Sequence, residues 1–203
     1  MIPSEAIWEA LARRRGNALV VPSMTSVRNW SRFSTDPELD FPNLPMGKGS
    51  SVGLGLALAR PERKVIVLDG DGSLLMNLGS LVTIANMRPK NYLYLLFQNG
   101  IYESTGGQIL PGSDLVDFAA IARDTGWPRI YEVTELADWE ARVDEVMSGD
   151  GPTFVRLTVP PTQPKLPLPA RTTSRAYREV KARLLREDAQ QERACLGRVS
   201  ASP

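Results

Sequence analysis

Two uninterrupted apolar runs constrain the fold of this chain more than any other feature. Residues 64–68 read KVIVL and residues 92–97 read YLYLLF, and each run has the length of a strand. A strand that is apolar at every position is buried on both faces, which is typical of a parallel sheet covered by helices. These two runs therefore predict the centre of an α/β domain.

Helical segments alternate with further short strands along the rest of the chain. Apolar residues recur at helical spacing in several segments, and short apolar runs separate them. Asp114 is the expected N-cap of one helix, in which Leu115 is expected to face inward. The alternation predicts an open, mainly parallel sheet with helices on both faces. We expect helices at 4–15, 52–59, 74–86, 114–124 and 135–147, and strands at 18–21, 64–68, 92–97, 130–133 and 153–159.

Proline separates a domain from a tail. Residues 160–169 read PPTQPKLPLP, which favours an extended strap over a core element. The following segment, 171–195, has a helical pattern and is highly charged. We therefore expect one domain at 1–159, and a proline-rich strap with a charged C-terminal helix or tail at 160–203. The tail either docks on a partner or is solvated.

The composition excludes several classes of function. Lys and Arg number 24 against 23 Asp and Glu, so a net charge of +1 gives no field that favours nucleic acid. No apolar stretch approaches the ~20 residues of a membrane span, so no membrane contact is expected. The single cysteine, Cys195, excludes an internal disulfide or a thiolate metal cluster and indicates a reducing, cytoplasmic setting. With no histidine, catalysis would use carboxylates, a hard metal, a cofactor or another chain.

Polar motifs follow both buried runs, at the place where ligands bind to a sheet of this kind. GDGS, residues 70–73, follows the first run, and QNGI, residues 98–101, follows the second. Ligands of open parallel sheets bind at the carboxyl ends of the strands. Asp71 offers a carboxylate and Asn99 an amide carbonyl, which are hard oxygen ligands suited to Mg²⁺. Each motif alone is a common turn, but their shared position favours a metal–diphosphate site.

The segment that joins these motifs resembles the signature of thiamine-diphosphate-dependent decarboxylases. That signature runs from Gly-Asp-Gly to a pair of asparagines, and Asp71 and Asn99 have the family's spacing of 28 positions. The first asparagine of the pair is replaced by Gln98 here. The resemblance implies that Asp71, Asn99 and the main-chain carbonyl of Ile101 bind Mg²⁺, and that thiamine diphosphate is the cofactor.

The resemblance extends beyond the signature, over roughly residues 4–168, and is closest to sulfopyruvate and phosphonopyruvate decarboxylases. The run MGKGSSVGLGLALA resembles the segment before the signature in these decarboxylases. In that segment a methionine supports the cofactor in its bent conformation. Met46 holds that place, although it could instead fill a gap in the core. Residues 99–108 resemble the run after the signature, and 25–28 resemble an upstream stretch more weakly. The implied cofactor contacts are Met46, Gly47, Gly70, Asp71, Gly72, Ser73, Asn99, Ile101 and Tyr102.

The chain resembles only one of the two similar domains of full-length family members. One domain grips the pyrimidine of the cofactor and the other grips its diphosphate, and this chain resembles the second. The family's activating glutamate lies in the first domain, so the resemblance assigns no catalytic residue here. It implies a lyase that is active only with a pyrimidine-binding subunit, in a dimerised heteromer, and that decarboxylates a small 2-oxoacid.

Four further residues are candidates for the substrate pocket. Lys48 and Arg28 could contact an anionic substrate group, and Glu103 and Ser104 lie beside the metal loop. Lys48 is equally interpreted as a solvated surface lysine, and Glu103 as an exposed loop residue. Two other functions remain open: a subunit of another thiamine-diphosphate enzyme, either a carbon–carbon ligase or a 2-oxoacid oxidoreductase, and a non-catalytic binding protein. The iron–sulfur ligands of the oxidoreductases would need cysteines that this chain lacks.

Overall fold

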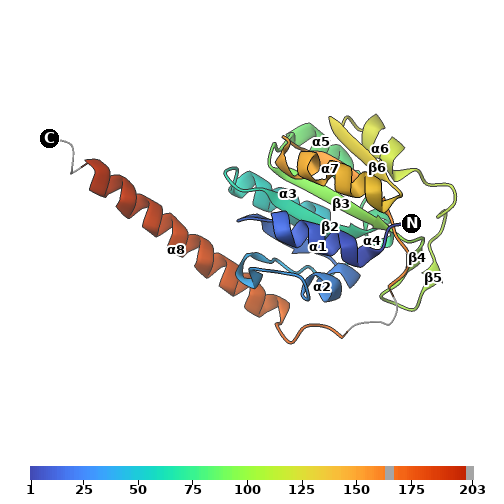
Figure 1. Cartoon of the computed structure of the whole chain (residues 1–203), viewed down its shortest axis with the longest axis horizontal. Coiled ribbons are helices and arrows are strands. Elements are labelled where there is room, and N and C mark those ends of the chain that lie inside the picture. The colour runs from blue at the N-terminus through green and yellow to red at the C-terminus, as the bar shows by residue number, and fades with distance from the viewer. Residues whose placement is uncertain (163–166, 200–203) are drawn as a thin grey trace.

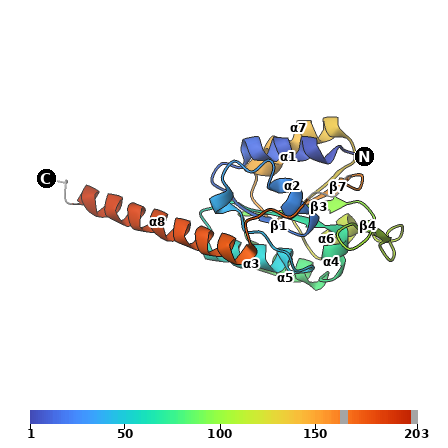
Figure 2. The ribbon, with the colours of Figure 1, turned by 90° about the horizontal axis from the view of Figure 1, so that it is seen from below.

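The computed structural model describes residues 1–162 and 167–199. Figures 1 and 2 show three layers, in which a central sheet has helices on each side. The elements in chain order are α1 (Ser4–Arg14), β1 (Leu19–Pro22), α2 (Thr25–Trp30), the 3-10 helix η1 (Pro37–Leu39), α3 (Gly49–Ala59), β2 (Val65–Gly70), α4 (Asp71–Leu75), α5 (Gly79–Met87), β3 (Tyr92–Gln98), β4 (Ile101–Tyr102), β5 (Gln108–Ile109), α6 (Phe118–Asp124), β6 (Arg129–Val133), α7 (Leu136–Ser148), β7 (Thr153–Thr158) and α8 (Thr173–Val199).

A five-stranded parallel sheet forms the middle layer. Its strand order is β1-β2-β3-β7-β6, so the two apolar runs pair with each other as β2 and β3. The register sets Gly70 of β2 beside Phe97 of β3, so the residues that follow these strands emerge at the same edge. The predicted α/β class, with an open and mainly parallel sheet, is confirmed.

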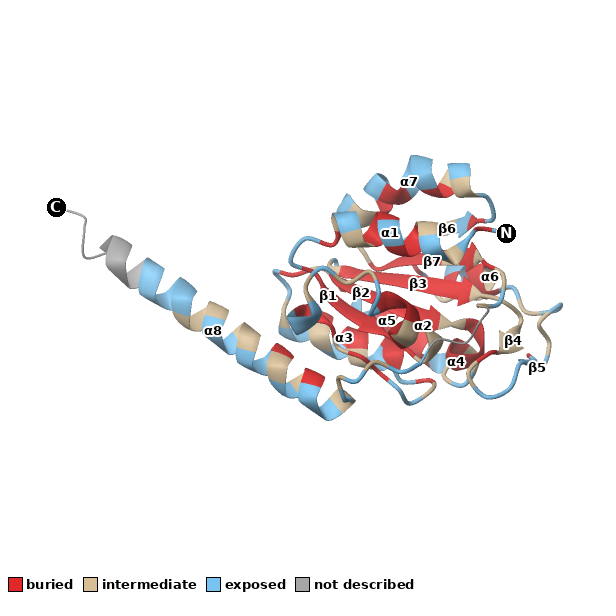
Figure 3. Ribbon diagram, turned by 60° about the horizontal axis from the view of Figure 1, so that its bottom comes forward, coloured by how far each residue is buried: buried red, intermediate tan, exposed pale blue. Residues whose placement is uncertain are grey.

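Successive side chains of each strand enter two different apolar cores. One core lies under α1 and α7, where Trp139 belongs to the same cluster as strand residues such as Leu68. The other lies under α3, α5 and α6, where Leu81 belongs to the same cluster as Val67. Figure 3 shows β1, β2 and β3 buried along almost their whole length. This double burial explains why these strands are apolar at nearly every position rather than at alternate ones, whereas the edge strand β6 is mostly intermediate or exposed.

Some details of the predicted elements are wrong. The expected helix at 74–86 is two helices, α4 and α5, separated by a short turn. Helix α6 begins at Phe118 because Asp117, rather than Asp114, is its N-cap and accepts a main-chain N–H at 2.9 Å. Leu115 therefore lies before the helix and is 83% exposed instead of facing inward. Strands β4 and β5, which form a small antiparallel hairpin, were not expected.

The last helix, α8, is docked on the domain along its first half. The ring of Tyr177 stacks on Phe41 with 3.7 Å between centroids, and Asp188 pairs with Arg60 at 2.7 Å. Beyond this pair the helix extends away from the domain (Figure 1). Part of the predicted strap, 163–166, lies outside the described residues, and the division of the chain at 159/160 stays a prediction. Among the described residues, no helix combines the length and the apolar character needed to cross a membrane.

Candidate functional site

The two polar motifs meet at the carboxyl edge of the sheet. Asp71 is the first residue of α4, directly after β2, and Asn99 follows β3. Oδ2 of Asp71 accepts hydrogen bonds from the main-chain N–H groups of Asn99, at 3.0 Å, and Gly100, at 2.7 Å. Oδ1 of Asp71 accepts the N–H of Gly72 at 2.8 Å. The carboxylate therefore ties the two strand ends together.

Asp71 is only 2% exposed, so burial is the main influence on the pKa of its carboxyl group. Loss of solvation raises the pKa of this carboxyl above its ordinary value, while the main-chain hydrogen bonds act in the opposite direction. All three donors are neutral amides, so none of them neutralises the charge of the carboxylate. A buried carboxylate held in this way is suited to a cation.

The side-chain amide of Asn99 is held from both ends. Its Oδ1 accepts the main-chain N–H of Ile101 at 3.1 Å, and its Nδ2 donates to Oε2 of Glu103 at 2.5 Å. Ile101 itself begins the small hairpin, where it pairs with Ile109. The loop that follows β3 thus fixes both ends of the Asn99 side-chain amide, and the main-chain N–H of the same residue binds Asp71.

The lone pairs that these hydrogen bonds leave on the oxygen atoms of Asp71 and Asn99 suit a Mg²⁺ ion bound to a diphosphate. A carboxylate offers about four lone-pair positions and an amide oxygen about two. The three N–H donors on Asp71 and the single donor on Asn99 leave lone pairs on both side chains. A carboxylate, an amide oxygen and a main-chain carbonyl such as that of Ile101 form a hard oxygen set, with positions left for phosphate oxygens and water.

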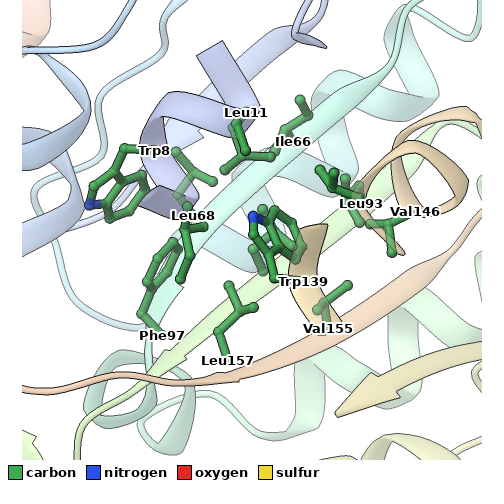
Figure 4. Close-up of a cluster of buried hydrophobic side chains, with 14 of the residues drawn as sticks. Trp8, Leu11, Ile66, Leu68, Leu93, Phe97, Trp139, Val146, Val155 and Leu157 are labelled. Atoms are coloured by element: carbon green, nitrogen blue, oxygen red, sulfur yellow. The ribbon is translucent and has the colours of Figure 1, made fainter. Parts of the chain in front are cut away.

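A cleft opens beside these residues at the same edge of the sheet, with about 580 Å³ of space that is partly open to solvent. Trp8 and Phe97 form an apolar wall, with ring centroids 4.1 Å apart and planes nearly parallel (Figure 4). The hydroxyls of Thr25 and Ser104 form a polar pair, 2.8 Å apart. Most of the residues predicted from the sequence line this cleft: Met46, Gly70, Asp71, Gly72, Ser73, Asn99, Ile101, Tyr102, Glu103 and Ser104.

Gly47 supports the cleft without lining it. Its N–H donates to the hydroxyl of Ser73 at 2.9 Å, and its carbonyl accepts from the side chain of Asn77 at 2.8 Å. Its φ of +69° favours glycine, and a Cβ at this position would approach the Cβ of Met76 to 3.1 Å. Gly47 therefore joins the loop before α3 to the start of α4.

Two predicted pocket residues lie outside the residues that line the cleft. Lys48 is exposed at the N-cap position of α3, and Arg28 is partly buried in α2. The segment around Arg28 still contributes to the cleft through Thr25 and Asn29, because those side chains project from α2 toward it. The roles of Lys48 and Arg28 in substrate binding stay predictions.

Several supporting residues were missed by sequence reasoning. Asp69 is fully buried, accepts the N–H of Gly70 at 3.0 Å and the hydroxyl of Tyr94 at 2.8 Å, and so anchors the turn that presents Asp71. Burial raises the pKa of Asp69. Thr162, in the strap, donates its N–H to Glu103 at 3.1 Å. Asp69 could have been noticed as a charged residue inside an apolar strand, whereas Thr162 has no local signal.

Comparison with known proteins identifies the family of this chain. Residues 32–157, more than half of the chain, match the family model for the thiamine pyrophosphate enzyme, C-terminal TPP binding domain. The chain is 42% identical over 123 residues to the beta subunit of sulfopyruvate decarboxylase from Methanothermobacter thermautotrophicus, covering 61% of this chain and 63% of that one. It is 43% identical over 116 residues to phosphonopyruvate decarboxylase from Streptomyces viridochromogenes, covering 57% of this chain and 29% of the other.

A solved structure shares the arrangement of helices and strands. An X-ray structure of a protein from Mycobacterium smegmatis, described as a thiamin diphosphate-dependent enzyme, superposes with a TM-score of 0.65 at 25% identity and covers 79% of this chain and 32% of that one. The chain spans less than two thirds of the length of each of these three proteins. On the family match, the chain belongs to the family of C-terminal TPP-binding domains of thiamine pyrophosphate enzymes.

Proposed function

We propose that this chain is the diphosphate-binding subunit of a thiamine-diphosphate-dependent 2-oxoacid decarboxylase made of two kinds of subunit. The observation that carries the proposal is the joint site of Asp71 and Asn99, whose strand ends are tied by the hydrogen bonds from Asn99 and Gly100 to Asp71. The similarity to the beta subunit of sulfopyruvate decarboxylase and to phosphonopyruvate decarboxylase supports the reaction type.

The residues of this chain would bind and orient the cofactor. Asp71, Asn99 and the carbonyl of Ile101 would hold Mg²⁺, and Gly72 and Ser73 would contact the diphosphate. Met46 would support the bound cofactor from the wall of the cleft. When bound, thiamine diphosphate supplies the electron sink for the carbon–carbon bond that breaks as carbon dioxide leaves.

The walls of the cleft would position the substrate and limit access of water. The apolar wall of Trp8 and Phe97 lowers the local polarity, which strengthens electrostatic interactions inside the cleft. The hydroxyls of Thr25 and Ser104 would face the polar groups of a small 2-oxoacid.

The site needs a group from another chain to be complete. Glu103 is a carboxylate in the cleft, and both of its oxygens are engaged, by Asn99 and by Thr162. The resemblance to the family, whose activating glutamate lies in the pyrimidine-binding domain, leads us to assign the acid–base role toward the aminopyrimidine to a glutamate on a pyrimidine-binding partner. The lone Cys195 leaves no internal disulfide to form, which supports a reducing, cytoplasmic location for the complex.

A charge-free surface next to the site is the proposed contact for this partner. Helices α3 and α5 contact each other and contain no Asp, Glu, Lys or Arg. Their outer residues include Leu58, Val82 and Met87, each 46% to 56% exposed, and Met76 after α4 is 61% exposed. Exposed apolar surface of this kind marks protein contacts, and Met76 directly follows α4, the helix that begins at Asp71.

Calorimetry on the full-length chain tests the cofactor assignment. Wild-type chain should bind thiamine diphosphate only when Mg²⁺ is present, and more tightly when the partner subunit is added. Asp71→Ala should remove the Mg²⁺ dependence, with affinity reduced at least about 100-fold, because the buried anionic ligand is lost. Affinity unchanged by Asp71→Ala would reject the assigned ligand.

Turnover separates the decarboxylase from the alternatives. The complex should release carbon dioxide from sulfopyruvate or phosphonopyruvate, and the purified chain alone should not. Cofactor binding with no decarboxylation of any 2-oxoacid by the complex would instead favour a ligase or oxidoreductase subunit. Absence of cofactor binding would favour a binding protein with this fold.

A further inference from the structure

Glu103 bridges two parts of the chain that meet over the cleft. It follows β4 and is 9% exposed. One carboxylate oxygen, Oε2, accepts from Nδ2 of Asn99 at 2.5 Å, and the other, Oε1, accepts the main-chain N–H of Thr162 at 3.1 Å. Thr162 is held in turn by Nδ2 of Asn29, which donates to its hydroxyl at 3.3 Å. The carboxylate is therefore fixed in direction, with one oxygen toward the strap and one toward Asn99.

The contact with Glu103 is one of two contacts that fix the orientation of the Asn99 amide. The two ends of an amide are nearly equal in shape, but one only accepts hydrogen bonds and the other only donates them. An ionised carboxylate only accepts, so it must face the NH₂ end. The N–H of Ile101, a donor, selects the oxygen end on the other side. Both contacts select the same orientation, with the NH₂ group toward Glu103 and the oxygen toward the N–H of Ile101.

We propose that Glu103 is a positioning residue that holds the carbonyl oxygen of Asn99 toward the Mg²⁺ ion. It acts through Asn99 and does not itself touch the metal or the cofactor. Partners behind a metal ligand fix its orientation, and their loss commonly lowers metal affinity 10- to 100-fold. The inference rests on the proposed function, since it concerns the same site.

A purely electrostatic role for Glu103 makes a different prediction. A negative charge near a cation site raises the affinity for the cation whatever its neighbour is. Orientation instead depends on Asn99 having two unlike ends. Replacing Asn99 by Asp removes that feature, because both ends of a carboxylate are oxygen atoms that accept hydrogen bonds. The new carboxylate would also be repelled by Glu103.

The test is a double-variant cycle on the full-length chain, with Mg²⁺ affinity measured by calorimetry at a fixed concentration of thiamine diphosphate. Glu103→Gln should weaken Mg²⁺ binding about 10- to 100-fold in the wild-type background. In the Asn99→Asp background the same change should weaken Mg²⁺ binding clearly less than in the wild-type background, because a carboxylate needs no orienting partner and only the loss of one nearby charge remains. Glu140→Gln, at an exposed position of α7, is the matched control and should change nothing.

The outcomes separate the possibilities. Equal weakening in both backgrounds, or no change in the wild-type background, would overturn the positioning role while leaving the proposed function intact. Absence of any Mg²⁺-dependent binding by the wild-type chain would overturn both. Thermal unfolding without metal checks that each variant is folded, and Glu103→Asp, which keeps an acceptor-only group, should recover part of the lost affinity.

Discussion

The two helical layers of this domain have similar inner faces and different outer faces. Helices α1 and α7 bury apolar residues against the sheet and carry charged residues outside, such as Glu140 and Arg142 of α7. Helices α3 and α5 bury apolar residues in the same way but carry no charged residue at all. The inner faces are determined by the sheet, so we interpret the difference by what lies beyond each layer in the proposed complex: water over α1 and α7, and the partner subunit over α3 and α5.

The largest expected effect tests whether the two inner faces contribute equally to stability. Trp139 of α7 and Leu81 of α5 are each 0% exposed, in opposite cores. Trp139→Ala should lower the free energy of unfolding by about 3–5 kcal/mol, and Leu81→Ala by about 2–5 kcal/mol, because each leaves a cavity in a packed core. Urea unfolding of the isolated chain measures both. A cost below about 1 kcal/mol for either variant would contradict the equivalence of the two cores.

The next prediction concerns the outer faces. Val82 of α5 is 56% exposed, so Val82→Asp should change the stability of the isolated chain by no more than about 0.5 kcal/mol. It should weaken association with the pyrimidine-binding subunit by about 100-fold or more, because an unpaired charge would be buried in the contact. Calorimetric titration of the partner subunit with the wild-type chain and with Val82→Asp gives the two affinities to be compared.

A matched charge change on the other layer is the control for this experiment. Glu140→Lys, at an exposed position of α7, reverses a charge that already faces water. It should leave partner affinity unchanged. Equal losses of affinity from the two variants would mean that the layers do not differ in the way proposed, whereas full affinity in Val82→Asp would place the partner elsewhere.

The same contrast explains how much of the fold and the site the sequence could predict. Strands β2 and β3 are recognisable because burial on both faces leaves a uniform apolar pattern. β2 and β3 are consecutive in the chain and pair in parallel, so their carboxyl ends lie at the same edge of the sheet. The proximity of Asp71 and Asn99, which follow these strands, can therefore be predicted from the apolar pattern as well. The sequence patterns also predicted helices where α1, α3, α5, α6 and α7 lie, although α2 was not expected and Asp117 displaced the expected cap of α6.

Contacts between distant segments could not be predicted. Glu103 meets Thr162 across 59 positions and Ser104 meets Thr25 across 79, and both contacts depend on the fold of the β4–β5 hairpin and on the path of the strap. No local pattern fixes either of these. Lys48 was a pocket candidate on the basis of its position in a motif, but the direction of a side chain at a helix start depends on the packing of α3, which leaves it exposed.

The smallest expected effect concerns the ion pairs of the charged layer. Arg14 of α1 donates to Asp144 of α7 at 2.5 Å, and the aspartate side chain is 77% exposed. The hydrogen bond from Arg14 lowers the pKa of Asp144 below its ordinary value of 3.8. A carboxyl with a lowered pKa in the folded state stabilises the fold above its unfolded pKa, and this stabilisation is lost as the pH falls through the lowered value.

Arg14→Met should therefore cause a small loss of stability at neutral pH and a smaller loss at acidic pH, below the lowered pKa of Asp144. High salt should also reduce the difference, because an exposed pair is screened. Thermal unfolding of both proteins at two pH values and two salt concentrations measures this. The variant should bind the partner subunit as wild type does, since α1 and α7 face water in the proposed complex. A loss of partner affinity in Arg14→Met would show that the charged layer is an interface too, and that charge pattern alone does not distinguish the two faces of this domain.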